Sequence, residues 1–100
     1  MLHTVNKSPF EKNSLESCLR LANTGDEILL IEDAVYAATP GTVVSEKMEA
    51  AISNHAVYAL GPDLFSRGID PAGLLEGIQV VDYSGFVDLT VKNDKVQAWL

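Results

Sequence analysis

Uninterrupted apolar runs alternate with helix-spaced apolar positions along this chain of 100 residues. Residues 28–31 read Ile-Leu-Leu-Ile, and such a run predicts a strand covered on both faces, as in a parallel sheet. From Leu15 through Cys18 to Ala22 the apolar residues recur every three or four positions, which predicts a helix with one apolar face. The chain therefore combines strand and helix patterns.

The same reasoning gives the expected elements of the whole chain. We expect strands at Leu2–Asn6, Glu27–Glu32, His55–Leu60 and Ile78–Asp82, with a last short strand or extended tail at Val96–Leu100. We expect helices at Asn13–Asn23, Val44–Ser53, Asp63–Arg67 and Tyr83–Asn93, a short helical turn at Ala34–Ala38, and a turn or short helix at Pro71–Glu76. Strands that alternate with helices predict an α/β fold with right-handed crossovers. We therefore predict one three-layer domain over residues 1–100, a parallel sheet flanked by helices.

Local signals set the expected helix ends. Asn13 is a favourable N-cap residue, and Glu16 three positions later completes a sequence of the capping-box type. Gly25 is suited to a left-handed cap after the first helix. Pro62 can open the helix that follows the third strand, and Gly68 ends it.

The charge balance excludes some classes of partner. The formal net charge is −7 and the isoelectric point is about 4.5, whereas binding to a nucleic-acid backbone needs clustered Lys and Arg. The cations are scattered from Lys7 to Lys95, so we expect no direct contact with nucleic acid.

No apolar stretch approaches the roughly 20 residues that span a membrane, and no secretory signal is visible. A lone cysteine without such a signal is typical of the reducing cytoplasm.

Polar residues follow each expected strand, at the edge where open parallel sheets bind ligands. These segments are Asn6-Lys7-Ser8, Glu32-Asp33, Gly61-Pro62-Asp63 and Asp82-Tyr83-Ser84. They form a small polar pocket, a docking face or an ordinary solvated loop surface, and the solvated surface is favoured. No glycine-rich phosphate loop is present, so we expect no nucleotide or flavin cofactor. His3 and His55 lack metal-ligand spacing, so we expect each to be a packed or edge histidine, and we expect no metal site.

Cys18 is the only cysteine and the one candidate nucleophile. A reactive thiol needs a lowered pKa, usually from a helix N-terminus or a nearby cation. Cys18 lies about five positions into its helix, beyond the first turn in which the helix dipole acts. Free cysteines are also among the most buried residue types. The residues alone favour a core cysteine, and a reactive, nucleophilic thiol remains the alternative.

Several blocks of sequence, in order along the chain, resemble the DsrH/TusB family of sulfur-relay subunits. The blocks are residues 1–10 (Met-Leu-His-Thr-Val-Asn-Lys-Ser-Pro-Phe), Gly25-Asp26, Glu32-Asp33, Val57–Leu60, Asp63-Leu64, Arg67-Gly68, Asp82-Tyr83, Phe86-Val87, Leu89–Val91 and Gln97–Leu100. Together they cover essentially the whole chain. The segment Asn13–Leu19, with its cysteine at position 18, resembles the DsrH branch more closely than the TusB branch.

The resemblance implies a small α/β domain of the DsrE-like, flavodoxin-like kind. It also implies a cytoplasmic heterohexamer with two homologous siblings, a DsrE/TusD-like and a DsrF/TusC-like subunit. Such complexes pass persulfide sulfur to a DsrC/TusE-like acceptor. The sulfur serves sulfur oxidation in the DsrH branch and 2-thiouridine synthesis in transfer RNA in the TusB branch.

One departure from the family pattern shapes the expected role. In the catalytic sibling, the sulfur-accepting cysteine precedes an Arg-Gly pair comparable to Arg67-Gly68, whereas residues 57–65 here contain no cysteine. We therefore expect a mainly structural subunit with Cys18 as a secondary sulfur site. The alternatives are an active persulfide carrier through Cys18 and a flavodoxin-like module that binds a small ligand.

Three aromatic residues have no obvious place in the expected core. They are Phe10, Phe86 and Trp99. In a multisubunit complex they would fill subunit interfaces, and in an isolated domain they would complete its own core.

Overall fold

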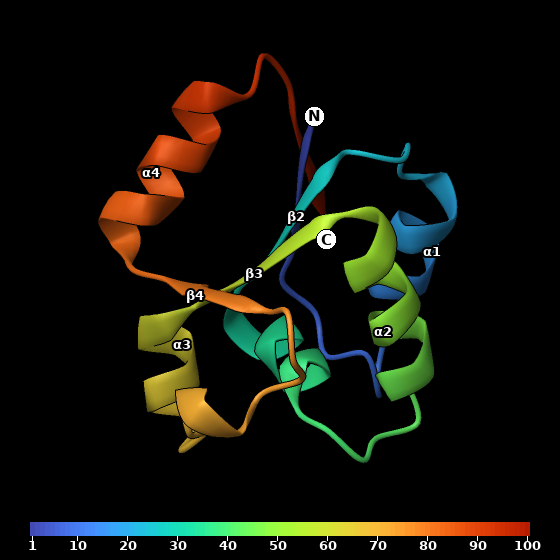
Figure 1. The fold of residues 1–100 in the computed structure, drawn as a ribbon, viewed down its shortest axis with the longest axis vertical. Coiled ribbons are helices and arrows are strands. Elements are labelled where there is room, and N and C mark those ends of the chain that lie inside the picture. The colour runs from blue at the N-terminus through green and yellow to red at the C-terminus, as the bar shows by residue number, and fades with distance from the viewer.

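Five parallel strands form the centre of the computed structural model, which describes residues 1–100 (Figure 1). The strands are β1 (Leu2–Val5), β2 (Glu27–Leu30), β3 (Ala56–Leu60), β4 (Gln79–Val81) and β5 (Val96–Trp99). They lie in the order β4-β3-β2-β1-β5, and every neighbouring pair is parallel. The last segment is thus a strand that pairs with β1, and not an extended tail. The predicted α/β architecture is confirmed.

Helices cover the two faces of this sheet unequally (Figure 1). They are α1 (Ser14–Leu21), α2 (Ser45–Asn54), α3 (Gly61–Ser66) and α4 (Tyr83–Lys92), with short 3₁₀ helices η1 (Glu32–Ala38) and η2 (Pro71–Gly73). On one face, α1, η1, α2 and α3 all contribute buried residues to one core, whereas α4 packs on the other face. None of these helices combines the length and apolar character needed to cross a membrane.

The strand order explains why α4 is alone. From β1 to β4 each strand lies one place further along the sheet, so three right-handed crossovers bring their helices to the same face. β5 lies beyond β1 at the opposite edge, so the crossover through α4 runs in the reverse direction. The same handedness therefore places α4 on the other face.

Two apolar clusters join the layers. The larger cluster lies between the sheet and the α1, η1 and α2 side, and its 14 buried residues include Cys18 and Met48. The smaller cluster contains Leu2, Leu29 and Leu89, and it joins the sheet to α4. Side chains alternate between the faces of a strand, which is how the same strands supply both clusters.

Of the three aromatic residues without an obvious place in the expected core, two pack in the core and one lies at the surface. Phe86 packs against the smaller cluster and Trp99 against the larger one, so both complete the core of this chain. Phe10, in the loop before α1, is half exposed.

The start and end of α1 differ from the expected signals. Asn13 occupies the N-cap position, but its side chain makes no capping hydrogen bond, and Glu16 instead pairs with Lys47 of α2 at 2.8 Å. The capping-box prediction was wrong on both sides: Asn13, with φ −98° and ψ 17°, lacks the extended backbone that is typical of a capping residue, and Lys47 on the neighbouring helix pairs with the Glu16 carboxylate. Gly25, with φ of +94°, lies in the turn beyond α1 rather than at a helix cap, since α1 already ends at Leu21.

Gly85 allows α4 to approach β4 closely. We therefore expect that replacing this helix glycine by alanine destabilises the fold, although such a change usually stabilises a helix. Alanine normally favours a helix over glycine by about 1 kcal/mol. A Cβ at position 85 would lie 2.9 Å from Val81 Cβ, so we expect Gly85→Ala to lower the free energy of unfolding by about 1–3 kcal/mol through overpacking. Urea unfolding measures the change.

The matched control is Gly73→Ala, because an added Cβ there meets no atom within 4 Å. We expect this control to be nearly neutral. A Gly85→Ala variant as stable as the parent would contradict the close contact between α4 and the sheet.

Candidate functional site

Cys18 lies inside the larger apolar cluster with none of its surface exposed. It shares the buried side of α1 with Leu15, as the helical spacing predicted. Burial raises the pKa of the Cys18 thiol to about 12, and the negative charge of Asp26 adds to this effect. None of the four surface clefts is lined by Cys18. In this conformation Cys18 is a protonated core thiol that a sulfur donor does not reach.

The polar segments that follow β2 and β3 are tied together at the carboxyl edge of the sheet. Glu32 begins η1 with a left-handed backbone, φ +49°, which is uncommon for a residue with a side chain. Asp63 in α3 holds this turn, because its Oδ2 accepts the Glu32 backbone N–H at 2.6 Å. The Asp63 carboxylate, one of the groups for which a polar pocket, a docking face and a solvated loop were the alternatives, is thus a structural hydrogen-bond acceptor.

Arg67 links the same two segments from the end of α3. Its Nε and Nη2 each lie 2.9 Å from Asp33 Oδ1, and its Nη1 donates to the Asp63 backbone oxygen at 3.2 Å. The chain then turns at Gly68, whose φ of +67° ends the helix as predicted. The guanidinium is therefore engaged in contacts between α3 and η1.

The polar segments that follow β4 and β1 differ in their contacts. Asp82 caps α4 by accepting the Gly85 N–H at 2.8 Å. Asn6 Oδ1 is buried without a hydrogen-bond partner. No group of three or more His, Cys, Asp or Glu side chains is placed to hold a metal ion. The edge brings together carboxylates and one paired cation, and it contains no cysteine.

A buried polar network near the amino edge was missed by sequence reasoning, which predicted only that His3 is packed. Trp99 Nε1–H donates to His3 Nδ1 at 3.0 Å, and His3 Nε2 lies 2.8 Å from Asp26 Oδ2. An indole nitrogen can only donate, so Nδ1 is the acceptor and Nε2 carries the hydrogen given to Asp26. The pKa of Asp26 is lowered mainly by this bond from His3; burial opposes the shift, and the Asn23 N–H supports it.

Glu27 forms a second network on the face covered by α4. Its Oε2 accepts hydrogen bonds from Tyr58 Oη at 2.8 Å and Lys92 Nζ at 2.9 Å, and its Oε1 accepts one from Asn93 Nδ2 at 2.9 Å. Burial raises the pKa of Glu27, but these three donors outweigh it, so the pKa lies below its ordinary value. Because Lys92 and Asn93 lie at the end of α4, the network fastens that helix to the sheet.

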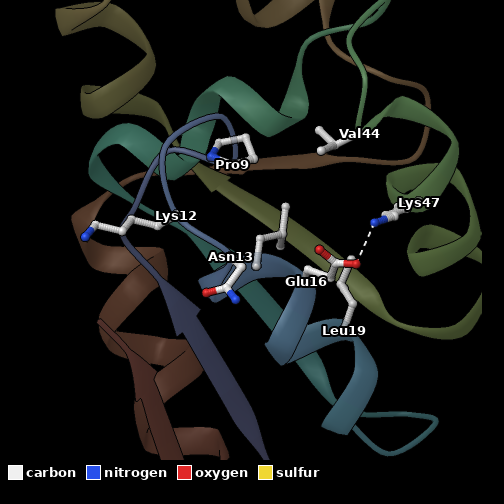
Figure 2. Close-up of a pocket in the computed structure, with 8 residues that line it drawn as sticks. Pro9, Lys12, Asn13, Glu16, Leu19, Val44 and Lys47 are labelled. Atoms are coloured by element: carbon white, nitrogen blue, oxygen red, sulfur yellow. Dashed lines mark hydrogen bonds and ion pairs between the residues drawn. The ribbon is translucent and has the colours of Figure 1, made fainter.

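The surface nearest to the helix of Cys18 is a groove between α1 and α2 (Figure 2). It contains a cleft of about 120 Å³, across which Glu16 and Lys47 form their ion pair. A second cleft of about 270 Å³ continues along the same helices as far as His55 and shares Glu16, Leu19 and Lys47. The groove has mixed polar and apolar walls and stays outside the core that holds Cys18.

The lowered pKa of Asp26 gives a pH-dependence prediction. A carboxylate with a lower pKa in the folded state stabilises the fold at pH above its unfolded value, about 3.9. That stability is lost as the pH falls through the folded value. Asp26→Asn removes the titration and the acceptor for His3, so we expect a loss of about 1–3 kcal/mol at pH 7. The difference from the parent should shrink as the pH falls below 4.

Urea unfolding between neutral and acid pH tests this prediction. Glu46→Gln is the control, because Glu46 is exposed on α2 and takes part in no side-chain hydrogen bond or ion pair. We expect its pH profile to follow that of the parent. Parallel profiles for Asp26→Asn and the parent would show that the His3–Asp26 bond does not contribute to the pH dependence.

Comparisons with known proteins agree with this fold. A solved structure of the ychN protein from Escherichia coli superposes with a TM-score of 0.81 and 25% identity, covering 97% of each chain. A protein of unknown function from Methanobacterium thermoautotrophicum superposes with a TM-score of 0.75 and 18% identity, covering 97% of this chain and 95% of that one. These likenesses show that other proteins of known structure share this fold over nearly the whole chain.

Sequence comparisons identify the family. Protein TusB from Shigella flexneri is 41% identical over 99 residues, which cover 99% of this chain and all of the relative. Protein TusB from Escherichia coli K12 is 40% identical over the same length, with the same coverage. A family model described as DsrH like protein matches residues 7–96. The predicted resemblance is therefore confirmed, and this chain belongs to the DsrH/TusB family of sulfur-relay proteins.

Proposed function

We propose that this chain is a structural subunit of a cytoplasmic sulfur-relay complex. Its partners are a DsrE/TusD-like and a DsrF/TusC-like sibling, and the complex passes persulfide sulfur to a DsrC/TusE-like acceptor. The burial of Cys18 carries the proposal, because a pKa of about 12 keeps the thiol protonated. Sulfur relay needs an accessible thiolate, so the reactive cysteine belongs to another subunit.

The region that holds the cysteine in the catalytic sibling supports the same role. Here residues 57–65 lie in β3 and α3 and contain no cysteine. Their polar contacts, from Asp63 to Glu32 and from Arg67 to Asp33, brace the loops at the carboxyl edge. The region is built to be stable rather than to present a nucleophile.

The relatives favour transfer RNA thiolation as the process that the complex serves. Proteins named TusB match the whole chain at 40–41% identity, and that branch of the family supplies sulfur for 2-thiouridine. The net charge of −7 opposes direct contact with the phosphates of the RNA, so in this proposal the chain acts before the sulfur reaches the RNA. Sulfur oxidation is the second candidate, because DsrH proteins carry a cysteine at the position of Cys18.

An active role for Cys18 would require α1 to open. The thiolate would attack the outer sulfur of a donor persulfide, the sulfur–sulfur bond would break, and the donor would leave as a thiolate. The closed packing of Cys18 and its raised pKa oppose this step. This alternative makes a different prediction about the reactivity of the folded chain.

Iodoacetamide labelling separates the two roles of Cys18, and the label is unambiguous because the chain has one cysteine. With a pKa of about 12, about one thiol in 10⁵ is ionised at pH 7. We expect intact-mass measurements to show no label on the folded chain at neutral pH and complete labelling in urea. Labelling of the folded chain at the rate of free cysteine would favour the carrier.

A genetic test addresses the proposed process. We expect deletion of this gene from its own host to lower 2-thiouridine in transfer RNA, as measured by nucleoside mass spectrometry. We expect a Cys18→Ala chain, shown to be folded by circular dichroism, to restore the parental level. A folded Cys18→Ala chain that restores nothing would overturn the structural role. A deletion that spares 2-thiouridine but abolishes sulfur oxidation would favour the second candidate.

A further inference from the structure

Helix α4 is apolar on two sides. Its inner side, with Phe86 and Leu89, packs on the sheet. Its outer side carries Tyr83, Val87 and Val91, which are 63%, 57% and 79% exposed. These three residues, here called the α4 stripe, follow one another at intervals of four, so they share one line along the helix. α4 lies apart from α1 and α2, on the other side of the sheet, in Figure 1.

The α4 stripe has no role within the chain that explains it. Valine is a weaker helix former than alanine, leucine or the charged residues common on helix surfaces, so Val87 and Val91 do not serve the helix itself. A lone surface helix normally has a polar outer side. Contiguous exposed apolar side chains mark interaction surfaces in soluble proteins.

A hollow extends the surface at the start of α4. It measures about 430 Å³ and is lined by Gly61, Val80, Val81, Asp82 and Gly85. The two glycines are required by close packing, because added Cβ atoms would lie 2.9 Å from Val81 and 3.2 Å from Val80. The glycines therefore let α3 and α4 pack closely against β4, and the hollow is a shallow depression at the surface of these segments.

The charges around the α4 stripe indicate which kind of molecule covers it. Asp88 lies next to Val87 on the exposed part of α4, and neither Asp88 nor the nearby Asp82 takes part in an ion pair. Lys92, the cation beside Val91 at the end of α4, is already paired with Glu27, so the unpaired charge on this helix is acidic. A second copy of this chain, also with a net charge of −7, would bring the same acidic residues to a symmetric contact and be repelled. A partner with Lys or Arg around an apolar surface is complementary.

We propose that the α4 stripe is the surface by which this chain binds a different polypeptide, whose apolar contact surface is rimmed by basic residues. The inference rests on the proposed function, in which that polypeptide is one of the two siblings. Asp88 pairs with a cation at the rim, and the apolar residues supply the centre of the contact.

The test compares two double variants in co-expression with the DsrE- and DsrF-like siblings. Val87→Glu with Val91→Glu changes the α4 stripe, and Leu21→Glu with Val43→Glu places the same charges at two other exposed apolar positions. All four positions are exposed, so we expect both chains to fold with parental circular dichroism. Native mass spectrometry and titration then measure assembly. We expect the α4 variant to bind at least about tenfold more weakly, and the control to assemble like the parent.

The outcomes separate this inference from the proposed function. A parent chain that binds neither sibling overturns the proposed function. A parent that assembles while the folded α4 variant assembles equally well overturns only the role of the α4 stripe. Asp88→Lys should also weaken assembly. Sedimentation of the parent alone supplies the last outcome: self-association abolished by the α4 variant would overturn the choice of a different polypeptide as partner.

Discussion

Much of this structure depends on the hydrogen bonds of Asp26, because they join parts of the chain that are distant in sequence. The carboxylate accepts hydrogen bonds from the His3 ring and the Asn23 backbone, and the Asp26 backbone oxygen lies 2.9 Å from His55 Nδ1. Through His3 the network continues to Trp99 in the edge strand β5. A buried anion is tolerated only when such partners satisfy it. The first and last strands and the starts of β2 and β3 are thus held together at one residue, Asp26, by its carboxylate and its backbone oxygen.

The same anion bears on the chemistry of Cys18. Its charge adds to burial in raising the pKa of the thiol, so the network that stabilises the sheet also disfavours the thiolate. An activated cysteine needs the opposite surroundings, a cation or helix N-terminus at an accessible position. Arg67 lies at the carboxyl edge and is hydrogen-bonded to Asp33. Cys18 lies on the buried side of α1, and no cation shifts its pKa. Stability and sulfur chemistry therefore make opposing demands, and this chain meets the first.

Much of the fold could be predicted from the sequence because its signals are local. The run at residues 28–31 lies in and just after β2, and the apolar spacing around Cys18 gave both a helix and the side of it that is buried. The His3 network could not be predicted, since its partners are 23 and 96 positions away. Glu16 failed as a cap for the same reason, because its competing partner Lys47 is set by tertiary packing. Periodicity identifies what is buried, and only the three-dimensional structure shows which charges meet.

The strand order carries a consequence for assembly. Since only one crossover runs backwards, a single helix must cover a whole face of the sheet, with its other side in contact with the surroundings. That helix is fixed at both ends, by the close approach of Gly85 to Val81 and by the bonds from Lys92 and Asn93 to Glu27. A surface held in this way loses little conformational freedom when a partner binds, which favours affinity. The well-fixed helix is therefore the one that we propose as the contact with another subunit, and this agrees with the proposed role of a subunit that supports chemistry done elsewhere.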